Sequence, residues 1–465
     1  MRIENIFFVG LLIGTFLSGS DLNAQTPELN FEKYQAYRKR LLNDFMVSSS
    51  GDELGTNIPA SIRNKKTRQI RWGDATINLS NYMAVLATEY ALFKANNIPV
   101  DETLLELHNA LLAMERLDVS AGIFYSDRNA QPTPNGFFIR DDIPANFTRD
   151  WEWKNPSFAD YHWVKSDYID QNISLNEMSQ DQVWHLIVGL ALISHLVDDT
   201  TGWSVPQYHG PLRFTLSQRA MVAGYRIIEI MRSRSCLINS KKGNGYLFVN
   251  YWHLKNPATG KRVKRGANPN FLKYGFAESG NFISQMAFGD LHWGNSRRGG
   301  IWYNLSKTFQ YLQRFTASGN FEYLYYLGST ATVGNVWSTR DLICMFNRHQ
   351  KLPFIPNPQY EHFALISCLL HDDCPKMLQK EKSLYETLLD KAPAEGPFNY
   401  GYDSDNLYEY EWSSIHRFVW PERRGSGTGE HHQGDYNGLD YMMLYNLYYL
   451  VYNPGGLKGY DFKGF

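Results

Sequence analysis

Residues 429–440, with the sequence GEHHQGDYNGLD, concentrate side chains that can transfer protons. Proton transfer at neutral pH needs groups whose pKa can be tuned toward neutrality, and imidazoles, carboxylates and phenols are the groups that enzymes use. The segment is therefore a candidate catalytic site, and a polar surface loop that precedes a helix is the alternative. The residues concerned are Glu430, His431, His432, Tyr436 and Asn437.

Elimination from a uronic acid is the chemistry that these residues suit best. It needs a base for the proton beside the carboxylate, an acid for the leaving oxygen, and donors or cations that neutralise the carboxylate. His432 and Tyr436 are four residues apart, so both lie around the N-terminus of a helix that begins near Gly434, where the helix dipole favours anions. Tyr436 as a packing residue with a hydrogen-bonded hydroxyl is the alternative.

Hydrolysis of a glycosidic bond needs a different set, a protonated carboxyl group and an ionised one. Asp141 and Asp142 are adjacent, so in an extended loop they point opposite ways and do not form such a pair. Asp181 at a predicted helix start interacts favourably with the helix dipole, which is a structural alternative, whereas a buried Glu278 is costly unless it is paired. The carboxylate candidates are Asp74, Asp141, Asp142, Asp150, Asp181 and Glu278.

Other side chains suit substrate binding or a partner role. Arginines pair with carboxylates or sulfates in a bidentate manner, although any one of them can equally form a surface ion pair. Tryptophan rings stack on sugar faces, although a single Trp is often simply buried. His185 is a catalytic candidate or a core histidine, and it or His292 is an alternative partner of Tyr436. The substrate-binding candidates are Asn437, Arg140, Asp142, Trp151, Trp153, Trp163 and Glu430, with Arg149, Arg297, Arg298 and Arg417 as further arginines.

Metal and nucleotide chemistry are not indicated. Glu430, His431, His432 and Asp435 lack the spacing of HExxH or of a calcium loop, and no phosphate-binding or nucleophile-elbow motif is present. We therefore expect neither a metal nor a cofactor.

The elements that must position these residues are mainly helices. Periodic apolar patterns predict a mostly helical chain, with strand-like alternation confined to a small hairpin at residues 246–251. Residues 118–178 carry no long periodic run, and their aromatic content argues against disorder. The predicted helices are 31–45, 78–96, 102–117, 180–197, 216–232, 268–288, 302–315, 321–346, 361–370, 376–389 and 439–451.

Two arrangements of such helices are open, a solenoid and a closed toroid of helical hairpins. A solenoid requires a fixed repeat, which the chain lacks, and large irregular loops favour the toroid. We expect an all-α fold, an (α/α) toroid of about six helical hairpins with long active-site loops, in one domain over residues 25–465.

The chain resembles the (α/α)-toroid carbohydrate-active enzymes, which include alginate-lyase-type polysaccharide lyases and unsaturated glucuronyl hydrolases. The motifs are Trp72-Gly73-Asp74, Met178-Ser179-Gln180-Asp181-Gln182, Glu430-His431-His432 and Tyr436-Asn437. Toroid lyases use a Tyr with a His and an Asn, so the resemblance implies these roles for Tyr436, His432 or His431, and Asn437. In those lyases the Tyr usually comes from a different segment than the His, which leaves the pairing open. The C-terminal β-sandwich of several such families is not expected here.

The charge composition argues against a nucleic-acid partner. The net charge is -1 with 20% charged residues, so no basic field exists to hold nucleic acid.

Residues 1–24 have a positive start, an apolar run and a small residue before a cleavage point, which predicts a signal peptide and a periplasmic or secreted protein. No stretch approaches the length of a membrane span. Cys368 and Cys374 are close enough in sequence for a disulfide, with free thiols as the alternative.

The sequence thus predicts an exported enzyme that acts on a uronate-containing poly- or oligosaccharide by β-elimination, as a polysaccharide lyase or a dehydratase, with a Tyr and His acid–base system. A glycoside hydrolase with paired Asp and Glu residues is the first alternative. A non-catalytic glycan-binding protein is the second.

Overall fold

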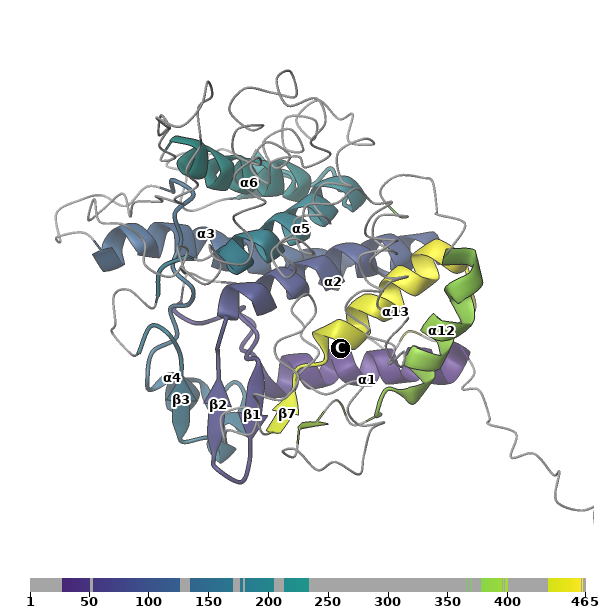
Figure 1. The fold of residues 1–465 in the computed structure, drawn as a ribbon, viewed down its shortest axis with the longest axis horizontal. Coiled ribbons are helices and arrows are strands. Elements are labelled where there is room, and N and C mark those ends of the chain that lie inside the picture. Colours follow the sequence, from purple (N-terminus) through teal and green to yellow (C-terminus); the bar gives the residue numbers. More distant parts are fainter. Residues whose placement is uncertain are drawn as a thin grey trace, which may run out of the picture.

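The computed structural model describes residues 27–50, 53–125, 134–169, 176–178, 180–204, 213–233, 378–394, 396, 398–399, 434–460 and 462, with residues 365 and 369. This part of the chain is mostly α-helical, as the sequence predicts (Figure 1). The long helices are α1 (Pro27–Asp44), α2 (Ala75–Ala95), α3 (Asp101–Tyr125), α5 (Gln180–Leu196), α6 (Leu216–Ser233), α12 (Leu378–Lys391) and α13 (Leu439–Tyr452).

Each of these seven helices coincides with a predicted one, with ends that differ by a few residues except at α3, which continues eight residues further to Tyr125. The predicted helices between residues 268 and 370 and the predicted hairpin at 246–251 lie outside the described residues, apart from positions 365 and 369. None of the helices in the described ranges is long and apolar enough to cross a membrane.

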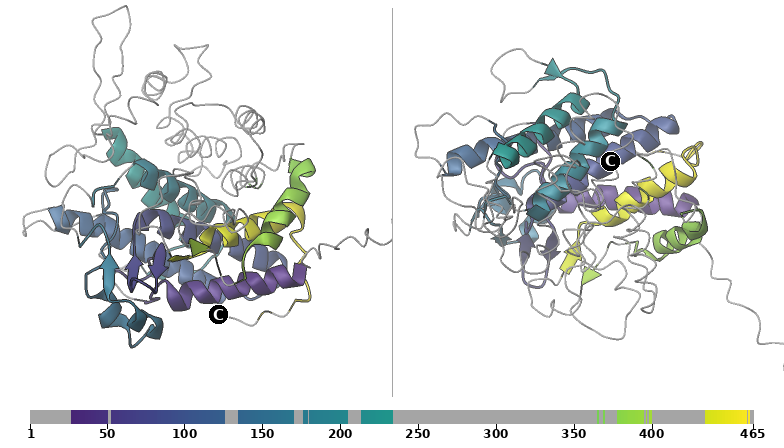
Figure 2. Two further views of the ribbon diagram at one scale, coloured as in Figure 1. Left: turned by 60° about the horizontal axis from the view of Figure 1, so that its bottom comes forward. Right: turned by 45° about the horizontal axis from the view of Figure 1, so that its top comes forward.

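Three helices, α13, α2 and α5, form one layer and run in the same direction (Figures 1 and 2). Along α13 and α2, Asn437 donates to Asn78 at 2.8 Å and Asn446 donates to the carbonyl of Val85 at 3.1 Å. A Cβ at Gly189 of α5 would lie 2.8 Å from the carbonyl oxygen of Ser80 in α2. Further along α2, the Tyr90 hydroxyl donates to Asp198 at 2.7 Å, just beyond the end of α5. In both helix pairs, residues later in one helix contact residues later in the other. The helices are therefore parallel, and all three start at the same end of the layer.

The neighbouring helices run antiparallel to this three-helix layer. Thr103 near the start of α3 donates to Glu89 near the end of α2 at 2.7 Å, and Ser217 at the start of α6 donates to the carbonyl of Ser194 near the end of α5 at 3.1 Å. The ring of Tyr37, late in α1, packs on that of Tyr441, early in α13, with centroids 4.5 Å apart. The helices therefore form antiparallel pairs, α2 with α3 and α5 with α6, while α1 covers α13.

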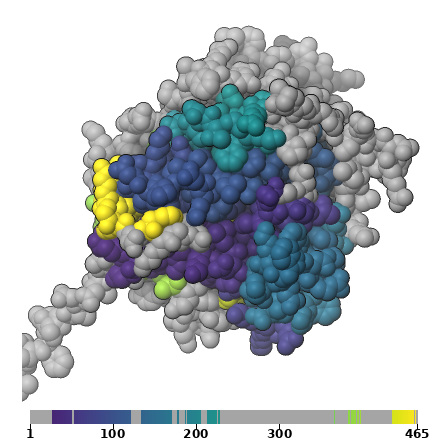
Figure 3. Space-filling model, turned by 180° about the vertical axis from the view of Figure 1, so that it is seen from behind, coloured from purple at the N-terminus to yellow at the C-terminus, as the bar shows by residue number. Residues whose placement is uncertain are grey.

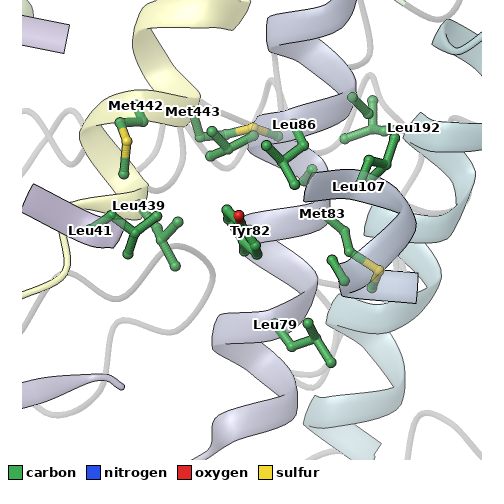
Figure 4. Packing of buried hydrophobic residues seen from close by; sticks show 14 of the residues in the cluster. Leu41, Leu79, Tyr82, Met83, Leu86, Leu107, Leu192, Leu439, Met442 and Met443 are labelled. Carbon is green, nitrogen blue, oxygen red and sulfur yellow. The ribbon is translucent and has the colours of Figure 1, made fainter. Parts of the chain in front are cut away.

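The hydrophobic core lies where α2 meets its neighbours, and α2 is buried on most of its sides (Figure 4). Met83 and Leu86 of α2, Leu192 of α5 and Met443 of α13 are fully buried in one cluster. Small residues at their contact, Gly189 of α5 and Ser80 of α2, let these two helices approach closely.

A five-stranded sheet lies at the end where the three-helix layer begins, with the order β3-β2-β1-β7-β6 (Figure 1). The chain passes from β2 through residues 72–74 into α2, and from β7 through residues 437–438 into α13. The strands are β1 (Ile62–Asn64), β2 (Gln69–Arg71), β3 (Trp163–Lys165), β6 (Phe398–Asn399) and β7 (Gly434–Tyr436); a separate pair consists of β4 (Trp203–Ser204) and β5 (Arg213–Phe214).

The sheet corrects one expectation about the C-terminal segment. Residues 434–436 are a strand paired with β1, and α13 begins at Leu439, not near Gly434. Gly434 has a φ of +134° and packs so tightly against Arg63 that a Cβ would collide with the Arg63 carbonyl. Such an approach suits a glycine in a strand and is incompatible with a helix start at this position.

The long segment without periodicity is ordered over residues 134–169. It contains the short helix α4 (Phe147–Trp151), the 3-10 helix η1 (Pro156–Asp160) and β3. Seen from behind, it forms a compact blue surface region beside α1 (Figure 3). Two of its own rings, those of Phe147 and Phe158, pack on each other and on the ring of Trp72. This aromatic packing explains how the segment is ordered without helical periodicity.

Candidate functional site

Several predicted site residues meet where the three-helix layer begins. Hydrogen bonds join the polar segments that precede α2, α5 and α13. Asn437 donates to Asn78 in the first turn of α2, at 2.8 Å, and to the carbonyl of Ala60 at 2.9 Å. Its side-chain oxygen accepts from the backbone of Leu439 at 3.2 Å and so satisfies a free amide at the start of α13. The predicted substrate-binding residue Asn437 therefore connects two helix starts.

Arg140 connects the segments before α2 and α5. Its Nη1 lies 3.4 Å from Asp74 and 3.6 Å from Asp167, and its Nε donates to the carbonyl of Glu177 at 2.8 Å. The side chain is almost fully buried, with 5% exposed. A buried guanidinium needs such compensation, and here two carboxylates and one carbonyl supply it.

Asp74 occupies the N-cap position of α2 in a left-handed conformation, with φ 53° and ψ 47°. Its carboxylate makes no capping hydrogen bond to the helix and pairs with Arg140. The left-handed region is unfavourable for a residue with a side chain, so the surroundings hold Asp74 in place. The motif Trp72-Gly73-Asp74 thus directs a carboxylate toward Arg140.

The adjacent carboxylates Asp141 and Asp142 have separate partners, as expected from their spacing. Asp141 is fully buried and accepts from the backbone amides of Ile143 and Asp167 at 3.2 and 2.8 Å. Burial and the nearby charge of Asp167 raise the pKa of Asp141 to about 8, although these hydrogen bonds act in the opposite direction. Asp142 pairs with Arg116 at 2.6 Å and accepts from the amide of Gly55 at 2.9 Å.

The register of the sheet places Tyr436 and Trp163 on the same face. Residues paired directly across strands point to the same side, and successive residues alternate. The pairs Tyr436 with Ile62, Ile62 with Arg71 and Arg71 with Lys165 therefore form one row across the sheet. Trp163, two residues before Lys165, points to the same side. We call this side the Tyr436 face; it also carries Gln69 and Asn64.

The two sides of the sheet differ in burial. On the side opposite the Tyr436 face, Ile70 is fully buried and the guanidinium of Arg63 lies 4.9 Å from the centre of the Phe45 ring. On the Tyr436 face, Trp163 is 66% exposed and Lys165 is also exposed, whereas Tyr436 is 8% exposed. The Tyr436 face is therefore open at its β3 edge, where Trp163 and Lys165 lie, and buried at Ile62 and Tyr436.

The other two predicted tryptophans lie together on α4 and just after it. Trp153 is 76% exposed, and its ring stacks on that of the half-buried Trp151 with centroids 5.9 Å apart. Stacking on sugar stays a prediction for all three tryptophans. Arg149 is largely exposed and pairs with Asp150 at 3.5 Å.

Other predicted residues lie wholly or partly outside the described structure. Positions 181 and 185 lie in the first two turns of α5, but their side chains are outside the described structure. The same holds for the whole of Glu278, Glu430, His431 and His432, and for His292, Arg297, Arg298, Arg417, Cys368 and Cys374. Within the ranges that are described, no group of three or more His, Cys, Asp or Glu residues could hold a metal ion.

Four contributors to this site had no signal in the sequence. Asp167 and Glu177 contact Arg140 from positions 27 and 37 residues further along the chain, in a region without periodicity. Arg71 and Lys165 were missed because their common face depends on pairing between β2 and β3, which are distant in sequence.

Comparisons of the chain with protein-family models, with curated proteins and with solved structures found no match.

Proposed function

We propose that this protein is an exported carbohydrate-active enzyme that cleaves or dehydrates uronate-containing poly- or oligosaccharides by β-elimination. The observation that carries the proposal is the row across the Tyr436 face. It sets a phenol, the base that elimination from a uronic acid can use, in one row with Ile62, Arg71 and Lys165. Cations in this position neutralise the carboxylate as negative charge develops beside it.

In this proposal the substrate lies along the Tyr436 face. The exposed ring of Trp163 stacks on one sugar, since one edge of the sheet presents it to solvent. Asn437 follows Tyr436 directly and, through its bonds to Ala60 and Asn78, holds in place the end of the sheet where α2 and α13 begin. His432 or His431, four and five residues before Tyr436, donates the proton to the leaving oxygen, with His185 as the other candidate.

We further propose that the helices close into an (α/α) toroid. Parallel helices α13, α2 and α5, each beside an antiparallel neighbour, form the arrangement expected for an arc of such a ring. The helices that the sequence predicts between residues 268 and 370 would complete it. In a closed toroid the starts of the inner helices surround one end, which is where the candidate residues gather.

The proposal is tested by incubating the protein with glucuronate-, mannuronate- and guluronate-containing glycans and following the ultraviolet absorbance of the new conjugated double bond. Absorbance should rise for at least one of them. Tyr436→Phe should lower the rate by at least about a hundredfold, because it removes the proton-accepting oxygen. Tyr448→Phe is the matched control: this tyrosine lies in α13 and donates to Glu386 at 2.6 Å, away from the sheet, so activity should persist.

Two results would overturn the proposal. New reducing ends without an unsaturated product would show hydrolysis. Binding without any product would show a glycan-binding protein.

A further inference from the structure

The α2–α5 interface holds two buried polar side chains whose hydrogen-bonding groups have no partner in the described part of the chain. Gln182, in the first turn of α5, is 0% exposed, and both its amide nitrogen and its carbonyl oxygen lack a partner. Thr76, in the first turn of α2, is also 0% exposed, and its hydroxyl lacks a partner. Buried polar groups are normally hydrogen-bonded, because each unsatisfied group costs about 1–3 kcal/mol.

The two side chains lie on the facing sides of these helices. Position 189 of α5 packs directly on Ser80 of α2, so these residues mark the line of contact. Gln182 is seven residues before Gly189 and Thr76 four before Ser80, and both spacings return to the same side of an α-helix. With a rise of about 1.5 Å per residue, the two positions differ by only about 4 to 5 Å along the helix axes.

Gln182 and Thr76 lie within the candidate site. Arg140 bonds Asp74, two residues before Thr76, and Glu177, five residues before Gln182. The two side chains therefore lie just past Arg140, between the first turns of two parallel helices. Two unpaired side chains there point to a ligand group and not to an isolated packing defect.

We propose that Gln182 and Thr76 bind a hydroxyl group of the saccharide, as a subsite next to Arg140. An amide offers one donor group and one acceptor, and a hydroxyl offers both, so together they match a group that both donates and accepts. Both are neutral and fully buried, and a charged group there would be left uncompensated. A sugar hydroxyl fits these requirements and a carboxylate does not. This inference rests on the proposed function for the nature of the ligand.

Replacement by residues of similar shape tests the subsite. Gln182→Met and Thr76→Val remove the unpaired groups, so without ligand the melting temperature should stay equal or rise. Binding of uronate tetrasaccharides, measured by calorimetry in the Tyr436→Phe background so that no turnover interferes, should weaken roughly tenfold or more in each variant.

Thr88→Val is the matched control in the same helix. Thr88 is also 0% exposed, but its hydroxyl donates to the carbonyl of Ala84 at 2.8 Å and accepts from Asn446 at 3.2 Å. Its loss should lower the melting temperature and leave tetrasaccharide binding unchanged.

Two outcomes would overturn the subsite. If Gln182→Met and Thr76→Val lower the melting temperature as Thr88→Val does, the groups are paired inside the protein, for example through water. If affinity is unchanged, or if neither uronate nor neutral tetrasaccharides bind the wild type, no saccharide hydroxyl is bound there. A third outcome separates the two proposals. If tetrasaccharide binding weakens in the variants but the wild type forms no unsaturated product, the subsite is supported and only the proposal of elimination is refuted.

Discussion

At the scale of single residues, the adjacent carboxylates Asp141 and Asp142 show how different the surroundings of neighbouring side chains can be. Asp142 has a guanidinium 2.6 Å away, whereas Asp141 relies on backbone amides and has a raised pKa. Sequence spacing predicted that the two point apart. It gave no indication of Arg116, because a contact over 26 residues depends on how residues 134–169 fold back onto α3.

Asp142→Asn should destabilise the protein by about 3–5 kcal/mol, because the change leaves the buried charge of Arg116 without its partner. Urea denaturation at neutral pH measures the loss. Asp150→Asn is the control, since Asp150 and its partner Arg149 are both largely exposed, and a change within about 0.5 kcal/mol is expected. Similar effects of the two variants would contradict a structural role for the Asp142 ion pair.

At the scale of elements, the turn from β7 into α13 positions Tyr436 and Asn437. Gly438 is the N-cap residue of α13 and has a φ of +76°, in the left-handed region that favours glycine. The ring of Tyr37 from α1 lies so close that a Cβ at this position would collide with it.

Gly438→Ala should therefore destabilise the protein by about 1–2 kcal/mol through backbone strain and by a further 1–3 kcal/mol or so through the collision with Tyr37. Gly459→Ala is a matched control, because Gly459 has a φ of +91° and no heavy atom lies within 4 Å of the added Cβ. Only the backbone strain should appear there. Equal losses of stability in thermal denaturation would show that the Tyr37 contact is unimportant.

His108 lies where α3 packs on α6, beside the buried ion pair of Arg219 and Glu115; it contacts Arg219 and stacks on Trp203 with ring centroids 4.5 Å apart. Burial and the charge of Arg219 lower the pKa of His108 from 6.5 to about 4. The folded state thus favours neutral His108, and stability should fall as the pH drops from about 6.5 to about 4. In His108→Gln, which does not titrate, the urea midpoint should depend less on pH in this window. An unchanged slope would contradict the prediction.

The helices were predictable from sequence and the strands were not, for physical reasons. An amphipathic helix such as α6 repeats its pattern over several turns, so local spacing identifies it. A three-residue strand such as β1 shows no alternation that stands out, and its partner β7 lies more than 370 residues away. The Tyr436 face exists only through this pairing, so the sequence could not show that Tyr436 and Trp163 share one side of a sheet.

At the scale of the whole molecule, a buried ionic network joins α1, α2 and α3. Arg38 pairs with Glu89 at 2.7 Å and with Glu106 at 2.9 Å, and all three side chains are mostly or fully buried. Tyr34 and Tyr82 donate to these same carboxylates. Burial and the charge of Glu89 already raise the pKa of Glu106, against the opposing effect of Arg38.

Arg38→Met should cost about 3–5 kcal/mol of stability near neutral pH, because two buried carboxylates lose their shared cation. Without Arg38, the folded-state pKa of Glu106, which burial already raises, should rise further above the unfolded value. The loss should then be small below about pH 4, where both states are protonated, and should grow as the pH increases. Urea midpoints at pH 5 and pH 8, compared with those of the wild type, measure this difference. An equal loss at both values would show that the carboxylates are not the cause.

The last described helix, α13, lies between the first, α1, and the central α2. The ring of Phe31 at the start of α1 packs on Tyr445, and on Tyr460 with centroids 5.8 Å apart. The core around α2 therefore cannot close until residues about 400 positions later have emerged from the ribosome, and contacts of such sequence separation form slowly. We therefore expect the nascent chain to lack its complete core until synthesis is nearly finished.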